Sequence, residues 1–245
     1  MWKGYTHALA LAGLGLHSLL VVVLLAKRTW TKFPSFLVYA SFGLVAGWGL
    51  YLIRTFRSFY FYGYWVSEGI GVLLGLAVLY EVFRGLLQSY TGLHRVAWIT
   101  FQLTVLLLII LSCVVGYSQP SVESNHLMST VLVGEEAARV VEIGLLLFLF
   151  IFSTAFGLHW RKQVFGIALG LGLFVAVELI GVTARTRFGI ALGAVNIARA
   201  TAFNLSLLIW IGYLLAPERV PSEADLPKRT QLEQWNQAIM ELINQ

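Results

Sequence analysis

Long apolar segments are the feature of this sequence that most constrains its fold. Seven of them occur along the 245 residues, at 5–26, 35–56, 63–87, 95–117, 137–159, 163–184 and 189–215. An α-helix needs about 20 mostly apolar residues to cross the hydrocarbon core of a bilayer, where only helices and closed barrels satisfy their own backbone polar groups. The sequence therefore predicts an all-α, polytopic membrane protein built as a bundle of seven transmembrane helices.

The composition argues against an ordinary soluble domain. Hydrophobic residues make up 58% of the chain and charged residues 12%, whereas soluble domains carry about 25% charged residues. The net charge of +5 is not gathered into a basic stripe with interleaved aromatic residues. We therefore expect the lipid bilayer as the main partner and no nucleic acid, because such an excess in a membrane protein usually reflects its cytoplasmic loops.

The positions of lysine and arginine predict the orientation. With the N-terminus outside, ten of these residues fall on the inner side: Lys27, Arg28, Lys32, Arg84, Arg95, Arg161, Lys162, Arg219, Lys228 and Arg229. Five fall on the outer side: Lys3, Arg54, Arg57, Arg185 and Arg187. Cytoplasmic loops are enriched in positive residues, so we predict an N-out, C-in, multi-pass protein of the bacterial cytoplasmic (inner) membrane.

Ionisable and polar groups inside the predicted spans are the candidates for a site. Such groups are costly in lipid and are functional candidates for that reason. They are Glu68, Glu142, Glu178, Asn196 and Arg199. Two hypotheses stay open, and they are compatible. In one, Arg199 pairs with Glu178 or Glu142 and locks helices together; in the other, the group lines a ligand pocket in the outer half of the bundle.

Two further pairs of opposite charge have helical spacing. Glu135 and Arg139 are four residues apart, and Glu81 and Arg84 are three apart. Residues at these spacings lie on one face of a helix. We predict both as local, helix-locking ion pairs, with Glu135 and Arg139 at the interface where the segment from 137 to 159 enters the membrane.

The last part of the chain differs from the rest. Residues 1–216 hold the apolar segments, and 217–245 read as a cytoplasmic linker followed by a short amphipathic helix. Its apolar face is formed by Leu232, Trp235, Ile239 and Leu242. A helix of this length is marginal alone. It is expected to dock on the protein's own cytoplasmic face, on a membrane or cytoplasmic partner protein, or on the membrane surface. A homo-oligomer through this helix or through the glycine-rich helix faces is a further alternative.

Motifs for catalysis, metal binding and cofactors are missing from the sequence. No lysine lies inside a span, so a retinal Schiff base is excluded. The sequence contains no HExxH, GxSxG, Walker loop or CxxC, and its histidines are not paired for haem. We predict a protein that is not an enzyme and that has no metal and no cofactor.

The architecture, the aromatic stretch YFYGYW at 60–65 and the junction LHWRKQVFGIALG at 158–170 resemble the bacterial heptahelical sensor-type membrane proteins, in particular their stand-alone members. The resemblance implies seven helices acting as an extracytoplasmic sensing module; no site residue carries over from it. The predicted function is a non-enzymatic receptor-like or accessory membrane protein with a cytoplasmic tail for partner docking. The alternatives are a structural subunit of a larger membrane complex, and a small transporter or channel with Glu142, Glu178 and Arg199 along its path.

Overall fold

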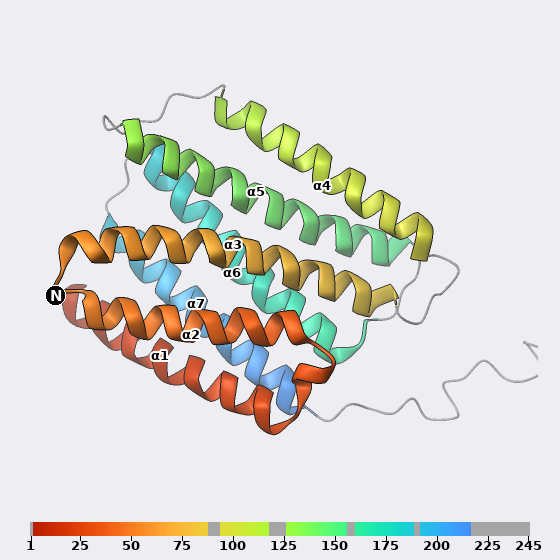
Figure 1. Cartoon of the computed structure of the whole chain (residues 1–245), viewed down its shortest axis with the longest axis horizontal. Helices are drawn as coiled ribbons and strands as arrows, with labels where there is room; N and C mark the ends of the chain where they lie inside the picture. The colour runs from red at the N-terminus through yellow and green to blue at the C-terminus, as the bar shows by residue number, and fades with distance from the viewer. Residues whose placement is uncertain (1, 88–93, 118–125, 156–159, 189–191, 217–245) are drawn as a thin grey trace, which may run out of the picture. The chain divides into compact units, whose positions relative to one another are not determined.

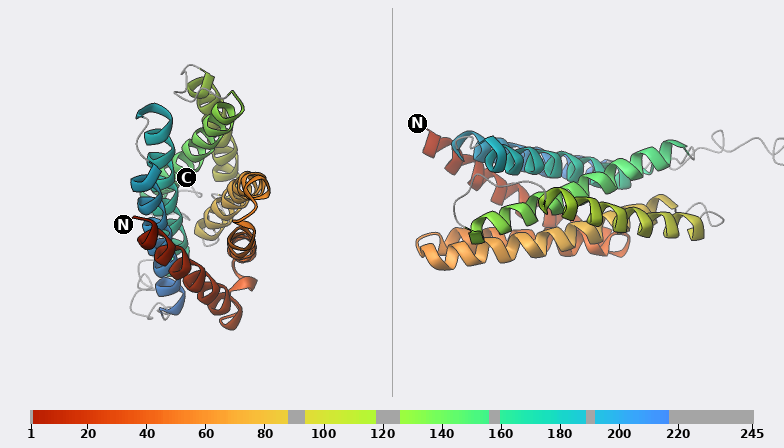
Figure 2. Two further views of the ribbon diagram at one scale, coloured as in Figure 1. Left: turned by 90° about the vertical axis from the view of Figure 1, so that its left-hand side faces the viewer. Right: turned by 90° about the horizontal axis from the view of Figure 1, so that it is seen from above.

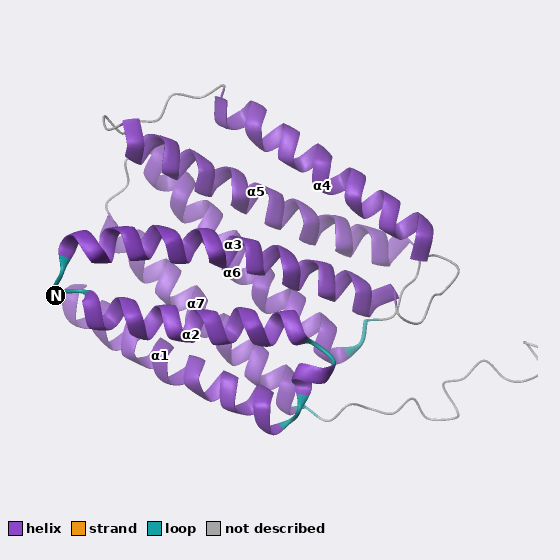
Figure 3. Cartoon of the chain, viewed as in Figure 1, coloured by secondary structure: helices purple, strands orange, loops and turns teal. Residues whose placement is uncertain are grey.

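The computed structural model describes residues 2–87, 94–117, 126–155, 160–188 and 192–216, and contains only helices and short connections in these ranges (Figure 3). The helices are α1 (Trp2–Ala26), the short 3-10 helix η1 (Thr29–Thr31), α2 (Pro34–Ile53), α3 (Arg57–Leu87), α4 (His94–Tyr117), α5 (His126–Ala155), α6 (Lys162–Phe188) and α7 (Leu192–Leu215). This confirms the prediction of an all-α chain.

Six of the described helices are long and apolar enough to cross a membrane. Their candidate spans are His7–Ala26, Pro34–Ile53, Ser58–Leu86, Val133–Ala155, Lys162–Ala184 and Gly193–Leu215. α4 contains a shorter apolar segment, Phe101–Ile110, within the residues that could be assessed. The chain is therefore a multi-pass membrane protein. A seventh crossing by α4 stays a prediction, as does the orientation.

The chain divides into two compact units, Met1–Leu215 and Ala216–Gln245. All the helices given above belong to the first unit. The predicted tail helix with Leu232, Trp235, Ile239 and Leu242 lies outside the described residues, so it stays a prediction.

The helices of the first unit alternate in direction, and six of them form a closed cycle of contacts (Figures 1 and 2). α1 packs on α2 and α7, α2 on α3, α3 on α5 and α6, α5 on α6, and α6 on α7. α4 lies at the edge of the bundle against α5, and its Phe101 ring also stacks on Phe83 of α3. We call the end where α1 begins the amino-terminal end, and the other the opposite end.

The apolar core lies mainly in the half nearer the opposite end. Trp210 of α7 is its largest fully buried side chain, and its ring meets Phe36 of α2 edge-on, with centroids 5.2 Å apart. The indole Nε1 donates a hydrogen bond to the Ile167 carbonyl oxygen of α6 at 3.1 Å. This close approach requires glycine on α6, because a methyl group at Gly170 would overlap the Trp210 ring and one at Gly166 would overlap Tyr213. Small residues let helices pack closely in lipid in this way.

The side chain of Glu81 caps the N-terminus of α2. Pro34 suits the first helical position, where no N–H is needed, but the preceding Phe33 provides no side-chain cap. The Glu81 carboxylate of α3 accepts hydrogen bonds from the backbone N–H groups of Ser35 and Phe36, both at 2.9 Å. The structure thus gives Glu81 a different role from the predicted local pair with Arg84, which is exposed. Two otherwise unsatisfied N–H groups are a stronger attraction for a carboxylate than a solvated cation.

Candidate functional site

A buried network of ion pairs joins four helices in the half nearer the amino-terminal end. Arg139 of α5 is at its centre and is 4% exposed. Its guanidinium donates to Glu142 one turn further along α5 at 2.8 Å, and it forms a second ion pair with Glu68 of α3. α5 and α3 are therefore held together by a charge on each helix.

Arg199 of α7 forms the second half of the network. It is ion-paired with Glu178 of α6 and donates to Glu135 of α5 at 3.1 Å. It also donates a longer hydrogen bond, 3.4 Å, to the Tyr64 hydroxyl of α3. Glu135, Arg139, Glu142 and Glu178 are all buried. We refer below to Glu68, Glu135, Arg139, Glu142, Glu178 and Arg199 as the ion-pair network.

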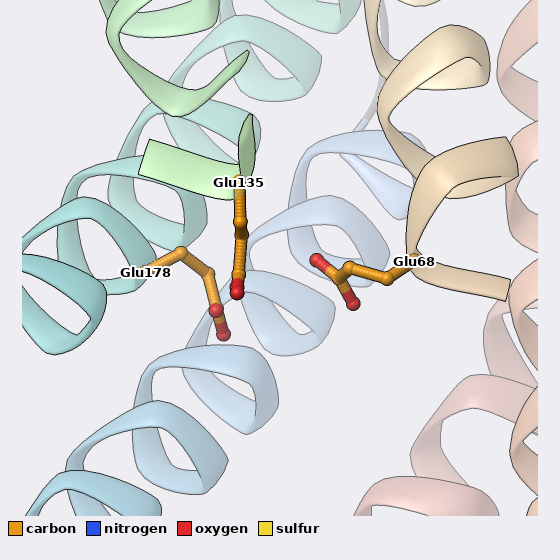
Figure 4. Close-up of side chains that lie close together, drawn as sticks. All are labelled: Glu68, Glu135 and Glu178. Carbon is orange, nitrogen blue, oxygen red and sulfur yellow. The ribbon is translucent and has the colours of Figure 1, made fainter. Parts of the chain in front are cut away.

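Three carboxylates of the network converge from different helices (Figure 4). One oxygen from each of Glu68, Glu135 and Glu178 lies within 4.8 Å of the others. This separation would suit a cation, but each of the three is already ion-paired with an arginine. The network therefore holds four carboxyl groups against two guanidinium groups, so removing a positive charge from it should cost far more than removing a negative one.

Arg199 forms ion pairs with other helices, as one of the two hypotheses predicted, but only one of its partners is a predicted one. Arg199 pairs with Glu178, as one alternative expected, and with Glu135, while Glu142 pairs with Arg139. The structure does not pair Glu135 with Arg139: Glu135 bonds Arg199 of α7, and Arg139 bonds Glu142 of its own helix and Glu68 of α3. The reason is the depth of this region, because α5 begins at His126 and its candidate span at Val133. The charged run lies inside the span, where helix neighbours replace water.

Glycine makes room for the most deeply buried carboxylate. Glu142 is 1% exposed and lies against the backbone of α3 at Gly75, where a methyl group would overlap its carboxylate. One turn earlier on α3, a methyl group at Gly71 would meet no atom within 4 Å. Of the two glycines, Gly75 alone is needed for the approach of α5 to α3.

A cavity of about 470 Å³ lies beside the network, between α1, α2, α3 and α7. Such a volume is in the range of ligand pockets, roughly 300–1,000 Å³. Its lining is mostly apolar and aromatic, with Leu14, Leu50 and Phe203 along its length. A second cavity of about 190 Å³ shares His17, Tyr64 and Phe203 with the first and reaches Glu68 and Arg139. We call the larger of the two the amino-terminal cavity.

Two buried side chains of the amino-terminal cavity carry a polar atom without a hydrogen-bond partner in the described structure. They are Nε2 of His17, which is 5% exposed, and Oδ1 of Asn204, which is 9% exposed. The Asn204 amide nitrogen is occupied, since it donates to the carbonyl oxygens of Leu9 and Ala200 at 3.1 and 2.9 Å. A buried polar atom without a partner costs about 1–3 kcal/mol. Both atoms are themselves covered by neighbouring atoms, but both side chains line the cavity, so a molecule bound there can pair with these atoms once the side chains turn toward it.

The mouth of the amino-terminal cavity carries a positive charge. Arg54 at the end of α2 donates to His7 Nε2 of α1 at 3.0 Å and lies over the Tyr51 ring, 4.2 Å from its centroid. Neither partner contributes a negative charge. No carboxylate in the described residues is ion-paired with Arg54.

Of the five predicted pocket residues, the structure brings four together. Glu68, Glu142, Glu178 and Arg199 belong to the ion-pair network, whereas Asn196 is exposed on α7. The sequence prediction missed Asn204 and His17, which line the cavity. Both were detectable as polar groups within apolar segments, but the helix face that meets other helices could not be read from a single sequence.

No protein-family model, curated protein or solved structure in the comparisons matches this chain. Fold and site together define a multi-pass α-helical membrane protein with a mostly apolar cavity beside a buried ion-pair network.

Proposed function

We propose that this chain is a receptor-like, non-enzymatic membrane protein that binds a small molecule in the amino-terminal cavity. The observation that carries the proposal is a cavity of about 470 Å³ lined by two buried side chains, His17 and Asn204, that each carry a polar atom without a hydrogen-bond partner. In the predicted orientation the cavity faces the outside of a bacterial cytoplasmic membrane, as the resemblance to heptahelical sensors implies.

The ion-pair network is suited to respond to a bound molecule. Tyr64 lines both cavities and accepts a hydrogen bond from Arg199, and Glu68 and Arg139 line the smaller cavity. A ligand that displaces Tyr64 would change the surroundings of Arg199, and through it the contacts of α7 with α5 and α6. Coupling of this kind needs a ligand with different affinity for two arrangements of the network. A partner bound to the cytoplasmic tail would receive the signal.

A transporter or channel is the second function considered from the sequence. It would need a polar path through the half nearer the opposite end. The largest fully buried side chains there are apolar or aromatic, among them Leu24, Phe36, Leu149 and Trp210. This packing supports a receptor over a channel. A structural subunit of a larger complex remains the alternative in which the network is only a lock.

The test compares two alanines on α1 that are both exposed. Ala10 lines the amino-terminal cavity, and Ala8 is not among its lining residues. We expect Ala10→Phe to fill the cavity and Ala8→Phe to leave it open. Each protein would be purified from native membranes and its retained small molecules identified by mass spectrometry. A compound should be retained by the unaltered protein and Ala8→Phe, and lost from Ala10→Phe. Identical sets of compounds from all three proteins would reject the cavity as a binding site.

A further inference from the structure

We infer that the ligand of the amino-terminal cavity is a single-chain amphiphile with a carboxylate at one end and a hydrogen-bond donor, such as a hydroxyl group, at the other. This inference rests on the proposed function, since it names the class of molecule that the same cavity would bind. Three regions of the cavity carry it: its mouth, its inner end and the apolar surface between them.

The mouth favours the carboxylate. Arg54 is exposed, has no carboxylate partner in the described residues, and its guanidinium bonds His7. The planar guanidinium group of arginine matches a carboxylate with two parallel hydrogen bonds. The nearby Tyr51 ring holds Arg54 at the cavity rather than free in the interface.

The inner end favours a hydrogen-bond donor and disfavours a negative charge. Oδ1 of an amide side chain can only accept hydrogen bonds, so Asn204 requires a donor from the ligand. His17 Nε2 accepts or donates according to its tautomer, and one hydroxyl group can serve both atoms. The adjoining smaller cavity is bounded by the network, in which carboxyl groups outnumber guanidinium groups. A carboxylate would be repelled there, which fixes the direction in which the molecule binds.

The surface between the two ends favours an unbranched apolar chain. Leu14, Leu50 and Phe203 line it, and a methyl group at Gly13, Gly43 or Gly47 would already lie 3.3 Å or less from another lining side chain, which leaves no room there for a branched molecule. His7 at the mouth and His17 at the inner end are ten residues apart on α1. Ten residues of α-helix rise about 15 Å, which is roughly the length of an extended chain of ten to twelve carbon atoms.

The test uses 12-hydroxydodecanoate, dodecanoate and 1,12-dodecanediol with the full chain in phosphatidylcholine nanodiscs, and empty nanodiscs as the blank. Native mass spectrometry would measure the bound fraction of each probe. We expect 12-hydroxydodecanoate to bind most tightly. Dodecanoate lacks the hydroxyl group and the diol lacks the charge, and each should bind roughly tenfold more weakly, the effect of one hydrogen bond to a buried or charged group.

Two variants assign the ends of the ligand. Arg54→Gln should remove the preference for 12-hydroxydodecanoate over the diol, and Asn204→Leu should remove its preference over dodecanoate. If Asn204→Leu does not accumulate, Gly13→Ala replaces it, because its methyl group would lie 3.3 Å from Asn204 Oδ1. Gly15→Ala is the matched control, since it would meet no atom within 4 Å.

Equal binding of the three probes, or preferences that survive both variants, would overturn the inferred ligand class. Binding that Ala10→Phe does not reduce would also overturn it, because the probe would then lie outside the cavity. Neither result would reject the proposed function. That proposal depends on the compound retained by the protein from native membranes, and it fails only if Ala10→Phe retains the same compounds.

Discussion

α6 and α7 pack against each other along their length, and two of their contacts differ in kind. Nearer the amino-terminal end, Glu178 of α6 forms an ion pair with Arg199 of α7. Nearer the opposite end, the Trp210 ring of α7 lies directly on the backbone of α6 at Gly170. The first contact joins two charges, whereas the second is close packing with a single hydrogen bond from the indole to a backbone carbonyl.

The difference follows from the solvent. Between helices in lipid, apolar surface gives little driving force, so close packing and polar pairs provide the association. Close packing leaves little space for a ligand, and apolar side chains fill most of the half around Trp210, whose ring borders only the smaller cavity. In the half nearer the amino-terminal end, ion pairs between long Arg and Glu side chains join the helices, and such side chains can span a wider separation between backbones. This half is therefore held together while a cavity remains beside the ion pairs.

Loss of a network arginine should have the largest effect. Arg139→Gln would leave Glu68 and Glu142 without their cation, and removing one partner of a buried ion pair costs about 3–5 kcal/mol. Glu135→Gln is the matched control, since Arg199 keeps Glu178 and the excess of carboxyl groups falls. Chemical unfolding in detergent micelles measures both. Equal losses for the two variants would show that the balance of charge in the network has no influence on stability.

A single methyl group should disturb the packed half. Gly170→Ala would overlap the Trp210 ring, whereas Gly172→Ala would meet Leu146 at an ordinary contact distance of 3.7 Å. Overpacking of this kind costs about 1–3 kcal/mol. We expect a lower thermal unfolding midpoint for Gly170→Ala only, measured in detergent micelles. An unchanged midpoint would mean that α6 and α7 can move apart at Gly170 without loss of stability, so that close packing would not hold this half together.

The smallest effect concerns a carboxylate outside the network. Glu81→Ala would leave two N–H groups at the start of α2 without acceptors, and loss of a helix cap costs about 0.5–2 kcal/mol. Arg84→Ala should change the free energy of unfolding little, because Glu81 does not pair with it in the structure. If both substitutions gave the same loss in chemical unfolding, the predicted local ion pair would be the better description of Glu81.

Much of the fold could be predicted because its strongest signal is local. The segments predicted at 35–56 and 95–117 correspond to α2 (Pro34–Ile53) and α4 (His94–Tyr117). The start of α5 was predicted late, since the charged run from 135 to 142 looked like the entrance of a helix into the membrane. A run of charges marks such an entrance only when water, and not another helix, satisfies it.

The members of the ion-pair network could be predicted in part, but its pairs could not. Because a charge in lipid is costly, the positions of Glu68, Glu142, Glu178 and Arg199 within apolar segments identify them as candidates from the sequence alone. Which of them meet depends on the rotation of each helix about its axis, a property of the packed bundle. Arg139 thus bonds Glu68, 71 positions away.

The sequence directly contains the apolar segments, their lengths and the costly charges within them. The helical class and the candidate charges therefore follow from the amino acids alone. The cavity, the exposure of Asn196 and the burial of Asn204 exist only once the helices pack. Asn196 and Asn204 lie eight residues apart on one helix and point about 80° apart. That angle places one at the surface and the other against the cavity, because the neighbours of α7 cover only part of its circumference.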